Sequence, residues 1–172
     1  MVLTAVMRKW VLKARLARVR RAGLQIADDC RLSGWPIWGS EPYLISIAEH
    51  VAMADGVTFI THDGGTWVFR REPRYRDVIK YGRITIHENC VIGAGVMLLP
   101  GIEIGPNSVV AAGSVVTRSV PPNSVAGGSP ARVFTTLEQY AEASLAAQRD
   151  YDVAAYRRDK RKELLRVFPR PW

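Results

Sequence analysis

The chain has 172 residues, enough for one domain with a sizeable core and an appendage, and too few for two independent catalytic domains. Apolar residues make up 48% and charged residues 23%, which excludes a disordered or fibrous protein. Two cysteines exclude a disulfide framework, and the N-terminus shows no secretory signal, so we expect a cytoplasmic protein. Without a run of about 18 apolar residues, no membrane-spanning helix is expected.

The net charge of +8 comes from cations that gather in two segments near the ends of the chain. Such segments suit an anionic membrane surface, a nucleic acid or a phosphorylated ligand, and equally a solvated helix face. We retain peripheral membrane contact, at the inner face of the membrane, for the first segment and expect no nucleic-acid partner. The cations are Arg8, Lys9, Lys13, Arg15, Arg18, Arg20 and Arg21, then Arg157, Arg158, Lys160, Arg161, Lys162, Arg166 and Arg170.

Residues 1–23 form the first predicted element, a basic amphipathic helix. Val6, Trp10 and Val19 recur among the cations at roughly helical spacing, and Gly23 ends the pattern. The helix either covers the end of a core or lies on a membrane.

The middle of the chain repeats every six residues, a period of neither helix nor strand. Six-residue units with an inward aliphatic residue predict a parallel β-helix, in which glycine and asparagine occupy the turns. Small or β-branched residues occupy a second column four positions further on. The first column is Ile86, Ile92, Leu98, Ile104, Val110 and Val116, and the second is Cys90, Val96, Ile102, Ser108, Ser114 and Val120.

The repeat also defines the other segments. It is visible from residue 26 and again from Ile47 to Phe59, with residues 34–43 out of phase. It is lost over residues 61–83, which must project from the β-helix as an excursion loop, a usual place for function. We therefore expect a β-helix domain over 24–133 and a C-terminal extension of one or two helices over 134–172.

The stretch ITIHENCVIGAGVMLLPGIEIGPNSVVAAGSVVTRSVPPNSVAGGSPARV resembles the hexapeptide-repeat acyltransferases, in the branch of sugar O-acetyltransferases and xenobiotic acetyltransferases. The resemblance covers about residues 26 to 133. It implies a mainly β fold, a left-handed parallel β-helix, with helical segments at both ends. It also implies a homotrimer with acetyl-CoA lying between adjacent subunits and no metal.

The resemblance also implies roles for individual residues. Relatives place a catalytic histidine on an excursion, and His62 is the only histidine in residues 61–83, so it is the expected general base for the acceptor hydroxyl. Relatives usually have lysine at Arg118, and some have arginine where this chain has Thr135. The positions that resemble CoA-contacting sites are Ala94, Ala112, Thr117, Arg118 and Arg132.

Other residues compete for or support the catalytic role. His87 departs from the repeat, and His50 fits a surface turn. Asp63 is the candidate to orient the imidazole of His62, with Asp55 or a backbone carbonyl as alternatives. Cys90 fits the core better than a nucleophile.

Aromatic and basic residues of the excursion are the candidates for binding the acceptor. Trp67, Arg70 and Tyr75 would suit a sugar ring and an anionic group. They would equally pack the loop on a neighbouring subunit.

The function expected is transfer of acetyl from acetyl-CoA to a hydroxyl of a sugar, or of a polysaccharide or glycolipid precursor. The alternative is an N-acetyltransferase acting on an amino sugar or an antibiotic. A trimeric zinc hydratase of the γ-carbonic-anhydrase type shares the architecture and uses three histidines, but the histidines here are too widely spaced. A non-catalytic scaffold would not bind CoA.

Overall fold

A computed structural model describes residues 2–169, with side chains from residue 10 onward. The side chains of Val6, Arg8 and Lys9, and all of Arg170, lie outside the described residues. The chain divides into two units, Met1–Leu137 and Glu138–Trp172, each described by itself.

The first unit holds one helix, three short 3₁₀ helices and thirteen strands among the described residues. They run in the order α1 (Val2–Arg21), β1 (Gln25–Ile26), β2 (Arg31–Leu32), η1 (Pro42–Leu44), β3 (Ile45–Ile47), β4 (Ala52–Met53), β5 (Thr58–Phe59), η2 (Gly64–Phe69), η3 (Pro73–Tyr75), β6 (Ile84–Ile86), β7 (Val91–Ile92), β8 (Met97–Leu98), β9 (Ile102–Ile104), β10 (Val109–Val110), β11 (Val115–Val116), β12 (Ser124–Gly128) and β13 (Ala131–Thr136).

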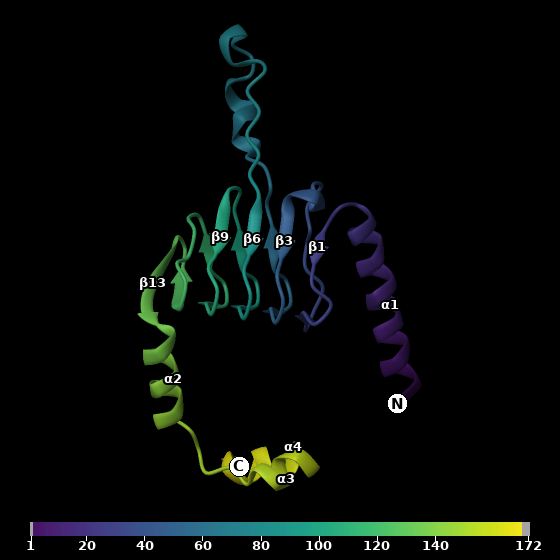
Figure 1. The fold of residues 1–172 in the computed structure, drawn as a ribbon, viewed down its shortest axis with the longest axis vertical. Coiled ribbons are helices and arrows are strands. Elements are labelled where there is room, and N and C mark those ends of the chain that lie inside the picture. Colours follow the sequence, from purple (N-terminus) through teal and green to yellow (C-terminus); the bar gives the residue numbers. More distant parts are fainter. Residues whose placement is uncertain (1, 170–172) are drawn as a thin grey trace. The chain divides into compact units, whose positions relative to one another are not determined.

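Three parallel sheets form the faces of a left-handed β-helix, which confirms the expected fold class (Figure 1). Sheet 1 has the order β1-β3-β6-β9, sheet 2 the order β13-β12-β10-β7-β4-β2, and sheet 3 the order β11-β8-β5. Among the strands of the described residues, β13 alone runs antiparallel, against β12. Successive coils stack in register, so that Ile86 lies beside Ile104 and Leu98 beside Val116.

The two predicted columns of the repeat form the core. Every residue of the first column has an exposed fraction of 0%, and every residue of the second is at most 5% exposed. A strand of two or three residues cannot hold itself together, so stability comes from stacking equivalent side chains over one another. The six-residue period is therefore a packing constraint.

Turn residues divide into two kinds. Asn89 and Asn107 have positive φ angles of 55°, and the amide of Asn89 donates to that of Asn107 at 2.7 Å, so asparagines stack between coils. Gly93 has no positive φ: a Cβ there would lie 2.4 Å from the backbone nitrogen of Ala112 in the next coil. That glycine serves close stacking of coils, which the sequence alone did not distinguish from turning.

Helix α1 covers part of the first coils. Leu16 and Val19 pack against the core, and Gly23, with φ of +101°, ends the helix as expected. The residues that follow the first coils are out of phase: Ile37 forms one bridge to Thr58 before η1 begins. No helix of the described residues is long and apolar enough to cross a membrane.

The described residues from Leu137 onward form three helices, one more than the greatest number expected: α2 (Leu137–Ala146), α3 (Val153–Arg158) and α4 (Lys160–Val167). Asp152 and Asp159 separate them because each carboxylate caps the next helix, accepting from the backbone N–H groups of Ala155 and Lys162. The division after Leu137 falls beyond the expected residue 134 because β13 continues to Thr136 on β12.

Candidate active site

The excursion leaves the β-helix between β5 in sheet 3 and β6 in sheet 1. Its two arms pair at the root, where His62 forms an antiparallel bridge with Tyr81. The Asp63 N–H donates to the carbonyl of Lys80 at 3.0 Å, and the Gly82 N–H donates to that of Thr61 at 2.9 Å. These hydrogen bonds fix the backbone of His62 at the root of the excursion, directly beside the coils.

His62 belongs to a chain of three polar side chains. Its Nδ1 lies 3.3 Å from Oε2 of Glu41, and the Thr61 hydroxyl donates to the same oxygen at 2.5 Å. The side chain of His62 is 45% exposed, whereas that of Glu41 is 12% exposed. A largely buried carboxylate thus contacts the Nδ1 of a partly exposed imidazole.

The environment of Glu41 keeps its carboxylate charged. The hydrogen bond from Thr61, followed by those from Ser40 and His62, lowers the pKa of Glu41 below its ordinary value, against the opposite effect of burial. In the tautomer with its proton on Nδ1, His62 donates to the charged Glu41 carboxylate, and Nε2 is then the nitrogen that can accept a proton. An imidazole paired with a carboxylate in this way can act chemically as a general base with an orienting group.

Glu41, and not the expected Asp63, lies beside the imidazole of His62. The carboxylate of Asp63 instead contacts Lys80 Nζ at 2.6 Å and the Gly65 N–H at 2.9 Å, where it caps η2. Lys80 lowers the pKa of Asp63. Adjacent side chains on an extended segment point to opposite sides, so Asp63 cannot share the side of His62 that Glu41 occupies. Glu41 lies 21 positions before His62, in the out-of-phase segment, and no sequence spacing marks it.

A pocket of about 250 Å³ opens beside His62 and brings in two of the three predicted acceptor residues. Trp67 and Arg70 line it, together with Tyr81 of the opposite arm, whose ring centroid lies 5.5 Å from that of His62. Tyr75, the third predicted acceptor residue, does not line the pocket and packs edge-on against Phe69. Arg70 also donates to the carbonyl of Val78 at 2.8 Å, so it braces the excursion as well.

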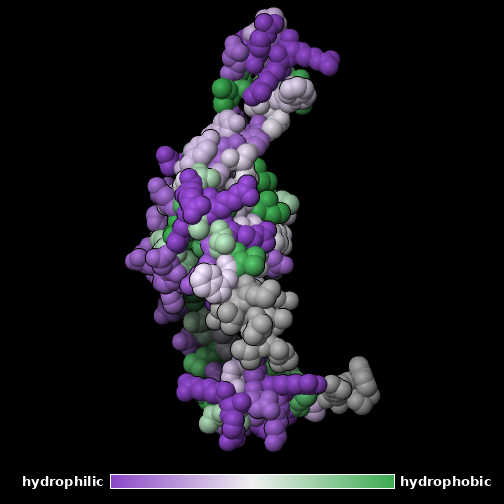
Figure 2. Space-filling model, turned by 90° about the vertical axis from the view of Figure 1, so that its right-hand side faces the viewer, coloured by the Kyte–Doolittle hydropathy of each residue, from purple (hydrophilic) through white to green (hydrophobic). Residues whose placement is uncertain are grey.

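The excursion exposes large apolar side chains (Figure 2). Its end carries hydrophilic residues, and hydrophobic residues lie between that end and the coils. Trp67 and Val68 have exposed fractions of 78% and 81%, and Ile79 and Tyr81 have 72% and 53%. An exposed apolar surface of this kind is typical of a binding face.

The positions expected to contact CoA fall at two different corners of the β-helix. Ala94 and Ala112 lie at the corner between sheets 2 and 3, where the Gly113 N–H donates to the carbonyl of Ala94 at 2.8 Å. Arg132 pairs with Gly127 at the same end of sheet 2. We call this the 2–3 corner.

Thr117 and Arg118 follow β11 and lie at the corner between sheets 3 and 1, which we call the 3–1 corner. The excursion leaves from this corner two coils away, after β5, because β8 lies between β5 and β11 in sheet 3. On the coil between them, the Gly101 N–H donates to the carbonyl of Arg83 at 3.0 Å. Within one chain, His62, Thr117 and Arg118 therefore lie on the side of the 3–1 corner, and Ala94, Ala112 and Arg132 lie at the 2–3 corner.

The other histidines lie apart from this site. His50 has a positive φ of 58° in a surface turn, as expected. The Nε2 of His87 lies 3.0 Å from a carboxylate oxygen of Glu103 on the neighbouring coil. Cys90 is buried and its pKa is raised by burial, which suits a core residue. The described residues contain no group of three or more histidine, cysteine or acidic side chains placed to hold a metal ion.

Comparison with known proteins places this geometry in a family. The model described as bacterial transferase hexapeptide (six repeats) matches residues 83–118. Protein CapG of Staphylococcus aureus is 42% identical over 153 residues, covering 88% of this chain and 87% of CapG.

Two named enzymes are similar over shorter stretches. The galactoside O-acetyltransferase of Escherichia coli is 38% identical over 102 residues, 56% of this chain and 46% of that protein, so the chain spans about half of its length. The solved structure of a maltose O-acetyltransferase from Clostridium difficile matches with a TM-score of 0.51 and 27% identity, covering 72% of this chain and 75% of that one.

The hexapeptide coils, the family match within them and the similarity to CapG along most of both chains lead to one conclusion. This chain belongs to the hexapeptide-repeat acyltransferases.

Proposed function

We propose that the protein transfers an acetyl group from acetyl-CoA to a hydroxyl of a sugar, with His62 as general base. The observation that carries the proposal is the Thr61–Glu41–His62 chain at the root of the excursion, which orients an exposed imidazole. The names of two relatives, a galactoside and a maltose O-acetyltransferase, support the choice of a sugar hydroxyl.

The reaction requires proton removal from a weak nucleophile. His62 Nε2 accepts the proton of the sugar hydroxyl as its oxygen attacks the thioester carbonyl, and Glu41 stabilises the imidazolium that forms. The tetrahedral intermediate collapses with cleavage of the carbon–sulfur bond, and the proton on His62 passes to the departing thiolate. The products are the acetyl ester and CoA, and no acyl-enzyme is needed.

The donor would lie along a corner of the coils. Ala94 and Ala112 are exposed and small, so an extended pantetheine chain could approach the backbone beside them. Arg118 and Arg132 are exposed guanidinium groups suited to phosphates. Arg132→Ala should therefore raise KM for acetyl-CoA more than KM for the acceptor.

We further propose that the enzyme is a homotrimer and that each site uses two copies. Within one chain, His62 leaves from the 3–1 corner, and Ala94, Ala112 and Arg132 lie at the 2–3 corner. Placing the 2–3 corner of a second copy against the excursion would join them and cover the apolar residues that the excursion exposes.

The acceptor would enter the pocket beside His62. Trp67 offers a face for a sugar ring, and Arg70 adds a positive charge. The pocket volume of about 250 Å³ holds only part of an oligosaccharide, so the rest of the acceptor would remain outside. A polysaccharide or glycolipid precursor, handled at the cytoplasmic face of a membrane, fits this description.

Acetyl-CoA consumption in the presence of a panel of neutral sugars, oligosaccharides and amino sugars tests the proposal. We expect turnover with a hydroxyl acceptor and an ester product that mild alkali removes. An amide product formed only from amino sugars would contradict O-acetylation. Failure to bind acetyl-CoA would contradict catalysis by this route altogether.

A further inference from the structure

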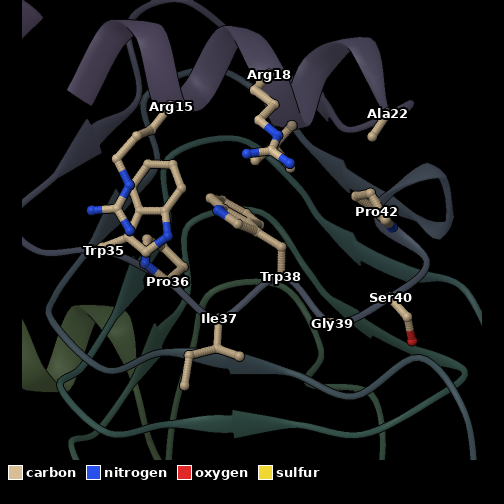
Figure 3. A pocket seen from close by; sticks show the side chains of 11 residues that line it. Arg15, Arg18, Ala22, Trp35, Pro36, Ile37, Trp38, Gly39, Ser40 and Pro42 are labelled. Carbon is tan, nitrogen blue, oxygen red and sulfur yellow. The ribbon is translucent and has the colours of Figure 1, made fainter. Parts of the chain in front are cut away.

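A second pocket, of about 740 Å³, lies between α1 and the out-of-phase segment of the first coils (Figure 3). The side chains of Arg15 and Arg18 extend into it from α1, and those of Trp35 and Trp38 extend from the opposite wall. The volume falls in the range of about 300 to 1000 Å³ that is usual for small-molecule sites. The pocket shares no lining residue with the one beside His62.

The aromatic wall is fixed by packing. Trp38 is 6% exposed and stacks on Phe59 of the core at 5.2 Å between ring centroids. Trp35 meets Trp38 edge-on at 6.1 Å. Both indoles are held by the coils, so the wall exists before any ligand binds.

Trp38 also contributes an unused hydrogen-bond donor. Its Nε1–H is buried and has no hydrogen-bond partner among the described residues. Figure 3 shows this nitrogen directed toward the space between Trp35 and Arg18. A buried donor left without an acceptor is unfavourable, so binding of a ligand that supplies an acceptor there is favoured.

The two arginines are not neutralised by the protein. The guanidinium of Arg15 lies 4.4 Å from the ring centroid of Trp35, and no described carboxylate forms an ion pair with Arg15 or Arg18. Arg20, on the other hand, pairs with Asp28 at 2.8 Å. Arg15 and Arg18 therefore concentrate positive charge beside the indoles.

The residues that line the pocket favour a ligand whose main part is apolar. Pro36 and Ile37 continue the apolar surface, and Ser40 is the only hydroxyl-bearing lining residue, so few groups could hold the hydroxyls of a sugar. Val11 is 55% exposed and lies four positions before Arg15 on the same helical face, which extends the apolar surface along α1.

We propose that this pocket binds a phosphate ester of an apolar alcohol. Arg15, Arg18 and the Nε1–H of Trp38 donate to the phosphate oxygens, and the apolar group lies against Pro36, Ile37 and the indoles. The site does not depend on the function proposed above for His62. A free prenyl phosphate and the phosphate head of a membrane lipid both have this chemistry.

Calorimetric titration of the full chain with farnesyl phosphate, farnesol and inorganic phosphate tests the proposal. We expect farnesyl phosphate, below its micellar concentration, to bind at least about tenfold more tightly than either of the others. Binding should be unchanged in His62→Ala, because the pocket and the base are separate.

Matched variants separate the pocket from general charge attraction. Arg15→Gln with Arg18→Gln should weaken binding about tenfold or more. Lys13→Gln with Arg21→Gln removes the same two charges from exposed positions of α1 outside the pocket and should change the affinity by less than about twofold. Trp38→Phe keeps the ring and removes only the donor, and should weaken binding about threefold or more.

Sedimentation with phosphatidylglycerol vesicles distinguishes the two sources. Vesicle binding that is lost in the Arg15 and Arg18 variant and kept in the control variant identifies a lipid headgroup; farnesyl phosphate binding without vesicle binding identifies a free ester. Equal weakening in both double variants would overturn the proposal, as would equal affinity for farnesyl phosphate and farnesol, or no binding of farnesyl phosphate.

Discussion

The coils of the β-helix and the excursion of residues 61–83 obey opposite rules. In the coils, each residue's place is set by the residue 18 positions away, as Ile86 lies beside Ile104, and the inward columns are buried throughout. The excursion has no repeat, exposes Trp67 and Val68, and is fixed mainly at its root. A repetitive scaffold presents similar positions at every coil, whereas the irregular segments, residues 34–43 and 61–83, bring together side chains that occur once, such as Glu41 and His62.

The largest expected effect is the loss of kcat when His62 of the excursion is replaced. His62→Ala should lower kcat about 100- to 10,000-fold, because proton transfer by a general base contributes that much. CoA affinity should stay the same, since the coils are intact. Steady-state kinetics with calorimetric CoA binding check this, and His50→Ala, in a surface turn, is the control that should retain full activity.

The free energy of unfolding, unlike kcat, should depend on the coils and hardly on the excursion. Leu98→Ala removes a fully buried side chain from a column and should lower the free energy of unfolding by about 2 to 5 kcal/mol. Val68→Ala, at a side chain that is 81% exposed on the excursion, should change it by less than about 0.5 kcal/mol. Urea denaturation of both variants measures the contrast, and equal losses would mean that the excursion is part of the folded core.

Glu41→Gln should lower kcat about 10- to 100-fold, short of the ~10,000-fold that loss of the orienting aspartate costs a serine protease. The KM for acetyl-CoA should not change. Asp63→Asn is the matched comparison, because its carboxylate contacts Lys80, and we expect it to keep kcat within about threefold. Equal losses in the two variants would contradict the assignment of Glu41 as the orienting group.

The smallest effect concerns pH. The hydrogen bond from Thr61 holds the pKa of Glu41 below its ordinary value of 4.5. Ionised Glu41 therefore stabilises the fold fully above that value, and the contribution is lost as pH falls through the lower pKa of the folded state. The difference in unfolding free energy between the protein and Glu41→Gln should shrink as pH falls below 4.5. A difference that grows on acidification would contradict the hydrogen-bond arrangement.

The two regions also differ in what their sequence reveals. The period of six predicts the buried columns because each inward position repeats a local requirement for an aliphatic or small residue. The same period located the excursion by its absence. Resemblance to the family supplied the left-handed sense and the roles of His62 and the CoA-contacting residues, which no periodicity contains. Those roles and the trimer stay predictions.

Residues that act through tertiary contact were not predictable. Glu41 reaches His62 only because the out-of-phase segment before η1 runs beside the excursion root. Tyr75 was grouped with Trp67 by composition, and the chain turns it toward Phe69. The pocket under α1 is formed by residues of a helix and of a coil that are separate in the sequence, so no local pattern reveals it.

The claim that each active site joins the excursion of one copy to the 2–3 corner of another has one direct test. His62→Ala lacks the base, and Ala112→Trp blocks the donor groove; each variant should be inactive alone. Unfolded together and reassembled in equal amounts, they should recover about a quarter of the normal activity, because a random pairing unites an intact excursion with an intact corner that often. No recovery in mixed assemblies would contradict the shared site.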